Sequence, residues 1–360
     1  MRIAFLAASM PQGPVGGLRI VYEYANRLAA RGHSVSVVHP RRFPPPKNLR
    51  GWARYETVRI LDSFSPIVPP KIEWQTIDRR VRMLYVPGLE ARWVPDGDAV
   101  FATFWTTAEP VLRYPKSKGA KFHLIQHYET WAGPKERVDA TWRAPLHKVV
   151  VSRWLYERGL DLGCQHMQYI PNGIDGQRYR LLNPVSARPK RIAMLFHQEE
   201  WKGCSDGLRA LRIVKERHPG VEVVVFGAPQ RDGCIPAWME YLENPPQAEL
   251  IGNVYNGSSI FVCPSWAEGF GLPAAEAMAC GCAVASTDCG GNLDYAEHET
   301  TALLSPPHRP EALARNIIRL LEDDALRQRL AAAGHDRVKA FNWQRSTDQL
   351  EQFILNHAAR

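Results

Sequence analysis

The feature that most constrains the fold is an alternation of short apolar strands and amphipathic helices. Arg2–Ala7 is an apolar run, and Pro11–Gly17 after it is rich in glycine and proline. Leu18–Arg31 spaces its apolar residues as one face of a helix, and Ser34–His39 has the β-branched character of a second strand. Because parallel strands need a crossover between them, this order predicts a right-handed βαβ unit and a parallel sheet.

The same alternation continues through the chain and restarts in its second half. Further strands are expected at 81–86, 98–103, 121–126, 147–151, 166–170, Arg191–Phe196, Val221–Phe226, Ile260–Cys263 and Ala283–Thr287. Further helices are expected at Ser205–Arg217, 310–322, 324–341 and 344–358, with another that opens at Leu272–Met278. The 360 residues suffice for two cores. The sequence therefore predicts an α/β protein of two Rossmann-like domains whose parallel sheets face each other across a central cleft, where such folds bind ligands.

The domain boundaries follow from turn residues and breaks in this pattern. Pro171–Asp175 is a turn-rich segment after a strand, so we expect one domain over 1–173 and a second over 174–342. The terminal helix at 343–360 is expected to pack back toward the first domain. The proline-rich stretch 41–75 interrupts the alternation and is expected to be an extended loop or an interrupted small element.

Charge is distributed unevenly between the halves. Residues 1–180 carry 27 Lys and Arg against 15 Asp and Glu, whereas 181–360 carry 18 against 22. This asymmetry suggests that the first domain meets an anionic partner. One hypothesis is an anionic membrane surface or a lipid-linked acceptor, bound by basic and aromatic residues of 41–75: Arg41, Arg42, Arg50, Trp52 and Arg54. A solvated basic surface is the alternative. No nucleic-acid motif accompanies the charge, so no nucleic-acid partner is expected.

Apolar runs and cysteines indicate where in the cell the protein is expected and whether it is expected to bind a metal. No apolar run reaches the roughly 18–20 residues that span a bilayer, and the apolar start is expected to be a strand, not a signal peptide. The seven cysteines are an odd number, which is typical of reduced thiols in a cytoplasmic protein. Cys280, Cys282 and Cys289 lack a histidine at ligand spacing, so no metal is expected. A cytoplasmic protein is predicted, with peripheral contact at the inner membrane face as an option.

The segment 264–281, PSWAEGFGLPAAEAMACG, carries the most specific chemistry. A strand ends before it, a glycine turn follows, and Pro273 suits the first turn of a helix. Backbone N–H groups of Gly269–Leu272 would then point from a helix N-terminus toward an anion such as a diphosphate. Glu268 lies in the turn, and Glu276 lies eight residues on, about one turn into the helix.

This segment resembles the E-x7-E motif of retaining glycosyltransferases of family 4, which have the GT-B fold. The likeness extends over nearly the whole chain, because further family features occur in the same order: Gly16-Gly17, the linker Pro171–Asp175, Lys202-Gly203 and the turn Gly290-Gly291. The resemblance implies that the first domain binds an acceptor and the second binds a nucleotide-sugar.

The resemblance also implies roles for individual residues. Glu276 would hold the donor ribose, Glu268 would bind hydroxyls of the transferred sugar, and Lys202 would neutralise the diphosphate. The implied catalytic residues are Lys202, His127 and Glu268. The implied donor-binding residues are Gly16, Gly17, His197, Lys202, Glu268, Gly269, Phe270, Gly271, Leu272 and Glu276. Aromatic and hydroxyl side chains after two strands suit an acceptor sugar, and Trp105, Thr106 and Tyr128 are the candidates.

The sequence departs from the family at one place. Relatives carry an arginine five or six residues before the lysine, where this chain has His197 and Phe196. Either His197 replaces it as a partly charged donor, or an arginine such as Arg153 or Arg19 reaches in.

The function implied is transfer of a sugar, with retention and without a metal or cofactor, to a cell-surface glycan, a lipid-linked or a small-molecule acceptor. A UDP-sugar is the expected donor, with GDP- and dTDP-sugars as options. The alternatives are a nucleotide-sugar epimerase and a non-catalytic nucleotide-sugar-binding subunit.

Overall fold

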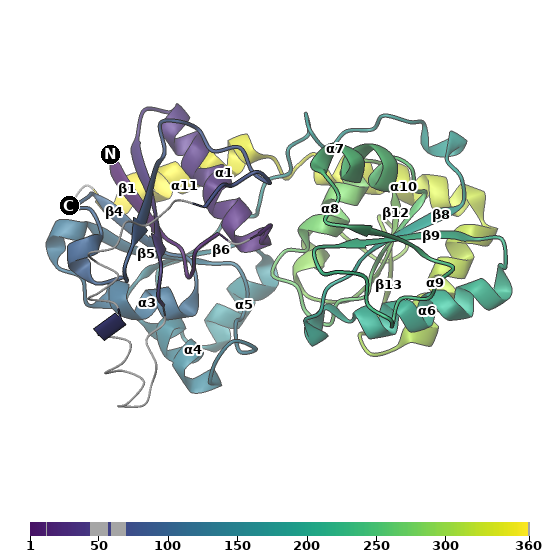
Figure 1. The fold of residues 1–360 in the computed structure, drawn as a ribbon, viewed down its shortest axis with the longest axis horizontal. Helices are drawn as coiled ribbons and strands as arrows, with labels where there is room; N and C mark the ends of the chain where they lie inside the picture. The colour runs from purple at the N-terminus through teal and green to yellow at the C-terminus, as the bar shows by residue number, and fades with distance from the viewer. Residues whose placement is uncertain (12, 44–56, 59–69, 359–360) are drawn as a thin grey trace. The chain divides into compact units, whose positions relative to one another are not determined.

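The chain forms two compact units. The computed structural model describes residues 1–11, 13–43, 57–58 and 70–358. One unit comprises Met1–Pro171 with Ser346–Arg360, and the other comprises Asn172–Arg345 (Figure 1). These divisions lie two and three residues from the boundaries expected after residues 173 and 342. Arg50, Trp52 and Arg54, which belong to the membrane hypothesis, lie outside the described residues.

The N-terminal unit is built on a parallel sheet with strand order β3-β2-β1-β4-β5-β6-β7. Its strands are β1 (Arg2–Leu6), β2 (Ser34–Pro40), β3 (Arg82–Val86), β4 (Ala99–Ala102), β5 (Ala120–Ile125), β6 (His147–Val150) and β7 (Met167–Tyr169). Its helices are α1 (Gly16–Ala30), α3 (Trp105–Leu112), α4 (Lys135–Arg143), α5 (Arg153–Asp161) and most of α11 (Trp343–Ala358).

The C-terminal unit repeats this arrangement with strand order β10-β9-β8-β11-β12-β13, again all parallel. Its strands are β8 (Arg191–Leu195), β9 (Glu222–Gly227), β10 (Glu240–Glu243), β11 (Ile260–Cys263), β12 (Ala283–Thr287) and β13 (Leu303–Ser305). Its helices are α6 (Cys204–Arg217), α7 (Gln247–Glu249), α8 (Leu272–Ala279), α9 (Pro310–Glu322) and α10 (Asp324–Val338), with a π-helix at Leu250–Tyr255.

Strand order places a switch point in each sheet. The chain winds outward from β1 to β3 and then returns to the other side of β1 with β4, and β8 and β11 have the same relation in the second sheet. Loops after such neighbouring strands diverge to opposite faces and leave room for a ligand. The predicted class, two α/β units with parallel sheets, is confirmed.

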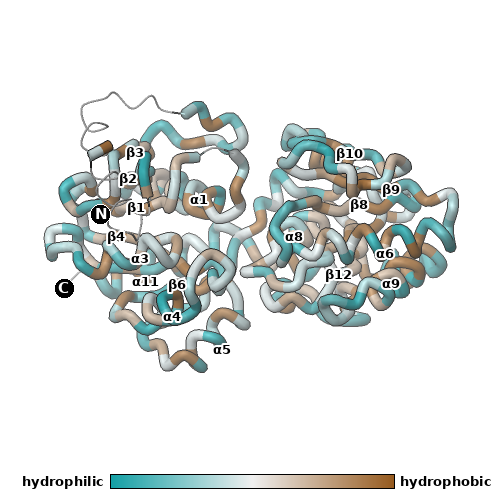
Figure 2. Tube along the Cα trace, turned by 60° about the horizontal axis from the view of Figure 1, so that its bottom comes forward, coloured by the Kyte–Doolittle hydropathy of each residue, from teal (hydrophilic) through white to brown (hydrophobic). Residues whose placement is uncertain are grey.

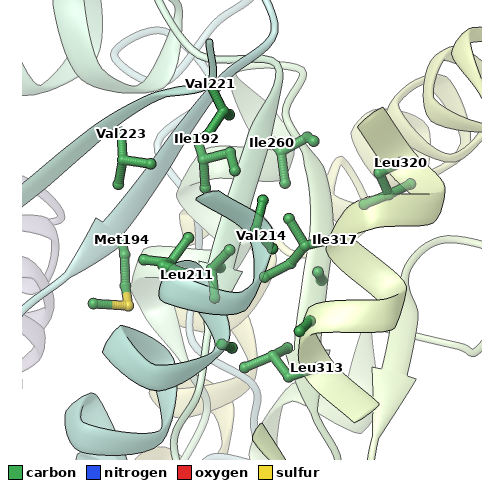
Figure 3. Packing of buried hydrophobic residues seen from close by; sticks show 14 of the residues in the cluster. Ile192, Met194, Leu211, Val214, Val221, Val223, Ile260, Leu313, Ile317 and Leu320 are labelled. Carbon is green, nitrogen blue, oxygen red and sulfur yellow. The ribbon is translucent and has the colours of Figure 1, made fainter. Parts of the chain in front are cut away.

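Burial of strand and helix faces holds each unit together. In the C-terminal unit, Ile192 and Ile260 of the sheet pack with Leu211 of α6 and Ile317 of α9 (Figure 3). The helices α6 and α9 carry both hydrophobic and hydrophilic segments along their length, as amphipathic helices do (Figure 2). A second cluster around Leu6 and neighbouring strands and helices fills one side of the N-terminal sheet.

The C-terminal helix α11 packs within the N-terminal unit. The ring of Phe353 lies 5.8 Å from that of Phe122 on β5. Glu351 accepts hydrogen bonds from Arg31 at 2.5 Å and from His33 at 2.7 Å. The chain thus leaves the first unit after β7 and returns to it at its end.

Several features of the fold differ from the sequence interpretation, and the strands β10 and β13 are among those that were not expected. The helices α3, α4 and α5 were not expected, because segments of eight or nine residues depend on packing more than on local propensity. Gly16 and Gly17 were expected in a loop, but they form the first turn of α1, with Val15 as an extended N-cap residue. The glycines therefore present helix N-terminal amides rather than a flexible loop.

Two buried histidines of the N-terminal unit predict a loss of stability in acid. His39 donates from Nδ1 to the Ser9 carbonyl at 2.8 Å, and its Nε2 accepts from the Tyr22 hydroxyl at 3.0 Å. Burial lowers the pKa of His39 from 6.5 to about 4. Burial, with the nearby Lys148 ammonium, lowers the pKa of His123 to about 3. Both rings are therefore neutral in the folded state at neutral pH.

The sign of the pH effect follows from these directions. Below pH 6.5 the unfolded chain binds protons that the folded chain excludes, so the contribution is complete above that pH and is lost toward pH 4. The free energy of unfolding in urea should fall by about 2–3 kcal/mol per pH unit from these two groups between pH 6 and 4. His39→Gln should make this dependence shallower by about half, and an unchanged slope would contradict the assignment.

Candidate active site

A lysine and a glutamate meet at the switch point of the C-terminal sheet. Lys202 ends a short 3-10 helix after β8, and Glu268 lies in the loop after β11. The Lys202 ammonium donates to Glu268 Oε1 at 2.8 Å and Oε2 at 3.0 Å, and it lies 4.2 Å from the centroid of the Trp201 ring. Glu268 is 7% exposed, so this charged pair is largely shielded from water.

Backbone contacts fix the two loops against each other. The Trp266 amide donates to the Trp201 carbonyl at 2.8 Å, and its indole N–H donates to Asp206 Oδ2 at 2.8 Å. Gly203 has a positive φ of 59°, and a Cβ there would lie 2.1 Å from the Pro264 carbonyl oxygen. A side chain at residue 203 would therefore push apart the two loops that carry Lys202 and Glu268.

The helix α8 begins beside this pair. Gly271 is its N-cap residue with a φ of 81°, and Pro273 stands in the first turn. The Tyr295 hydroxyl donates to the Gly271 carbonyl at 2.6 Å, and the buried ring of Phe270 packs 5.5 Å from Tyr295. Phe270 therefore offers a ligand its backbone only. The first-turn amides of α8 have no acceptor within the helix and give this end a partial positive charge.

Glu276 lies inside the C-terminal unit and not on its surface. It is 3% exposed, and its Oε2 accepts a hydrogen bond of 3.4 Å from the Tyr255 hydroxyl. Tyr255 ends the π-helix, a rare element that occurs often at functional sites. A buried carboxylate that already accepts a hydrogen bond from a hydroxyl is suited to accept further hydrogen bonds from the hydroxyls of a ligand.

A small pocket opens beside Lys202 and Glu268. Its lining includes Leu195, His197, Lys202, Cys263, Ser265 and Glu268. His197 Nδ1 accepts a hydrogen bond from the Glu199 amide at 3.1 Å, so the proton of the neutral ring sits on Nε2. Burial and the Lys202 charge lower the pKa of His197. The lowered pKa favours the neutral ring of His197, and its role as a replacement for the family arginine stays a prediction.

The predicted residues of the N-terminal unit gather at the carboxyl ends of its strands. Gly17 and the segment after β5 are in contact, since Gln126 Nε2 donates to the Gly17 carbonyl at 3.2 Å. His127 follows Gln126, and its ring lies 6.4 Å from Trp131 and 6.1 Å from Trp154. Gly16 and Gly17, with this histidine, thus belong to one edge of the sheet.

The three candidate acceptor residues have structural contacts. Trp105 and Thr106 are 4% and 6% exposed at the start of α3. The Tyr128 hydroxyl donates to Asp139 Oδ1 at 2.6 Å, and burial with this carboxylate raises the pKa of Tyr128. These contacts position the three side chains within the unit, and their role in acceptor binding stays a prediction.

Two further findings concern metals and membranes. Within the described ranges, no group of three or more His, Cys, Asp and Glu side chains is placed to hold a metal ion. The cysteines, including Cys280, Cys282 and Cys289, are free thiols. Among the helices at 1–11, 13–43, 57–58 and 70–358, none combines the length and apolar character that crossing a membrane requires.

Comparison with known proteins identifies the family. The family described as glycosyl transferases group 1 matches residues 183–337, which is most of the C-terminal unit and contains Lys202, Glu268 and Glu276. Residues 183–337 of the chain belong to this family. A glycogen synthase of Mycobacterium tuberculosis is 25% identical to this glycosyltransferase, over 99% of this chain and 94% of that protein.

Other relatives align over shorter shares of their length. The O-antigen biosynthesis protein RfbC of Myxococcus xanthus is 28% identical over 78% of this chain, which spans only 22% of that protein. A D-inositol 3-phosphate glycosyltransferase of Rhodococcus erythropolis is 32% identical over 49% of this chain, and the alignment covers 46% of the length of that protein.

Solved structures show the same fold over the whole glycosyltransferase. Sucrose-phosphate synthase from Thermosynechococcus elongatus matches with a TM-score of 0.75 at 19% identity, covering 99% of this chain and 98% of its own. HepE from Anabaena, solved with UDP-glucose, matches with a TM-score of 0.73 at 15% identity. This match covers 99% of this chain and 100% of the HepE chain. The predicted GT-B fold is confirmed.

The structure adds site residues that the sequence interpretation missed. The Ser265 hydroxyl donates to Glu268 Oε1 at 2.7 Å and so shares this carboxylate with Lys202. Its position three residues before Glu268 was a signal that could have been used. Tyr255 was not recognisable, because 21 residues and a strand separate it from Glu276.

Proposed function

We propose that this glycosyltransferase moves a sugar from a nucleotide-diphosphate sugar to an acceptor hydroxyl, with retention of configuration. The observation that carries the proposal is the Lys202–Glu268 pair at the switch point, beside the N-terminus of α8 and the buried Glu276. These groups match what such a donor presents: two phosphates, sugar hydroxyls and a ribose. Gly16, Gly17 and His127 of the N-terminal unit stay proposed contacts of the donor.

Donor binding would exchange the partners of Lys202. The ammonium, held by Glu268 in this structure, would turn to the diphosphate, whose charge is larger. Glu268 would then be available to accept hydroxyls of the transferred sugar, still oriented by Ser265. Glu276 would accept ribose hydroxyls.

Leaving-group stabilisation is the proposed main catalytic effect. As the bond from the anomeric carbon to the phosphate oxygen breaks, negative charge grows on the diphosphate, and Lys202 with the first-turn amides of α8 would stabilise it. The leaving oxygen would take the acceptor's proton as the new bond forms on the same face. This front-face route requires neither a protein nucleophile nor a metal, and His127 would face the donor sugar.

A UDP-sugar is the first donor to test, since HepE, which shares the fold, was solved with UDP-glucose. In a thermal-shift panel of UDP, GDP, dTDP and ADP, one nucleotide should stabilise the protein. The gain is about 2.7 kcal/mol at a hundredfold excess over Kd, a rise of several degrees in the midpoint. Glu276→Gln should reduce this shift if the carboxylate binds ribose. No response to any of the four would remove the proposal.

The alternatives give different products. An epimerase would convert the donor without an acceptor, and a non-catalytic subunit would bind nucleotide but leave the donor intact. Slow donor hydrolysis, with faster nucleotide release when acceptor is added, would support transfer over both. The acceptor is proposed to be a glycan, a lipid-linked precursor or a small molecule met in the cytoplasm, with contact to the inner membrane face through the basic first domain as part of the proposal.

A further inference from the structure

Four aromatic side chains form a cluster at the carboxyl edge of the N-terminal sheet, here called the aromatic platform: Phe104, His127, Trp131 and Trp154. They follow β4, β5 and β6, three strands that are neighbours in the sheet. Ring centroids of Trp131 and Phe104 lie 6.1 Å apart, and His127 lies 6.4 Å from Trp131 and 6.1 Å from Trp154. Trp131 is 48% exposed.

The loop that carries Trp131 is held firmly although its tip is exposed. Glu129, 6% exposed, accepts a hydrogen bond of 2.7 Å from the Trp105 amide at the start of α3. Tyr128 is held by Asp139 on α4. Gly133 lets the loop approach α3 closely, because a Cβ there would lie 2.3 Å from the Trp105 ring.

Buried hydrogen bonds thus hold the loop, while the Trp131 ring is exposed at its tip. Such a preformed arrangement favours binding, because little conformational entropy is lost when a ligand binds. Burial also raises the pKa of the Glu129 carboxyl well above its ordinary value, which favours the neutral form of this side chain.

We propose that the aromatic platform binds a sugar ring of the acceptor, which makes the acceptor a carbohydrate. This inference rests on the proposed function. A pyranose has a face of C–H groups, which packs against the negative face of an aromatic ring, and an edge of hydroxyls that seeks polar partners. The platform supplies Trp131 for the face, while Gln126 and Thr130, both half-buried, stand beside it in the same loop.

Its position agrees with this role. Ligands of parallel α/β sheets bind beyond the carboxyl ends of the strands, where all the platform residues lie. Gln126 also contacts Gly17 at the first turn of α1, so the platform is continuous with residues proposed to face the donor. A lipid chain would instead require a continuous apolar groove, and polar residues interrupt this surface. Sequence reasoning chose Trp105, Thr106 and Tyr128, whose contacts support the platform from within.

Binding of the full chain to a glycan array tests the proposal. Wild type should bind a subset of the glycans, and Trp131→Ala should weaken that binding by about tenfold or more, as for an aromatic at the centre of an interface. Trp131→Phe keeps a ring and should stay within about threefold. Trp238→Ala is the matched control, because Trp238 is 37% exposed in the other unit with Lys215 5.0 Å from its ring, and it should bind as wild type does.

Several outcomes would overturn the inference: no glycan bound by wild type, equal binding by Trp131→Ala, or binding by wild type only to vesicles of anionic lipid. The thermal shift with nucleoside diphosphates, run on the same preparations, separates this test from the proposed function. A nucleotide response without glycan binding removes the acceptor class alone. Loss of the nucleotide response removes the enzyme proposal.

Discussion

Lys202→Ala is expected to lower kcat about a hundredfold or more, an increase of about 2–4 kcal/mol in the barrier. The reason is that the ammonium contacts Glu268, which lies four residues before the start of α8, where leaving-group charge would develop. Donor turnover by the purified variant measures the effect. Because the carboxylate of Glu268 loses a partner in this variant, its unfolding midpoint should be recorded beside the activity.

A matched control is available in the same unit. Lys215 also lies over a tryptophan, 5.0 Å from the Trp238 ring, but outside the pocket. Lys215→Ala should therefore keep wild-type turnover. The double variant Lys202→Ala with Glu268→Gln would show coupling, since the two groups contact each other and their separate losses should not add. Near-normal turnover of Lys202→Ala would exclude it as the leaving-group cation.

Arg188→Met is expected to destabilise the C-terminal unit by about 3–5 kcal/mol, the effect of breaking a buried polar network. Arg188 is 6% exposed, and burial lowers its pKa. Its guanidinium donates to the carbonyls of Tyr255 and Ser258, each at 3.1 Å, and to that of Cys280 at 2.5 Å. It also donates to Asn256 Oδ1 at 2.9 Å. Methionine has similar length but no N–H group, so each of these four acceptors would lose its hydrogen bond from the guanidinium.

The loss should also reach the active site. Arg188 fixes the end of the π-helix, and Tyr255 at that end contacts Glu276. Nucleotide affinity should therefore weaken together with stability. Urea unfolding and nucleotide titration measure the two effects. Arg209→Met is the control, because the pair of Arg209 and Glu311 is exposed, and it should change stability by less than about 1 kcal/mol.

The strand pattern made most of the fold predictable. Apolar runs such as Ile260–Cys263 and Ala283–Thr287 coincide with β11 and β12, because a strand buried on both faces has a composition that local sequence reveals. The short helices α3, α4 and α5 were missed, since packing against the sheet stabilises them more than their own sequence does. The terminal helix α11 was recognisable, but its contacts with Phe122 and Arg31 are long-range.

The active site, too, was predictable from the sequence only in part. Glu268, Gly271 and Glu276 were identified from spacing within one segment, because a turn and the helix after it are determined by nearby residues. Lys202 was connected with them through resemblance, and only the strand order β8-β11 shows the two loops in contact.

The sequence by itself determined two α/β units, the position of the glycine turn and the two carboxylates. The tertiary structure decided which side chains face outward. It buried Trp105 and exposed Trp131, and it placed His197 Nδ1 as the acceptor of the Glu199 amide. The physical reason is that periodicity is local, whereas the environment of a side chain depends on strands and helices that are distant in the sequence.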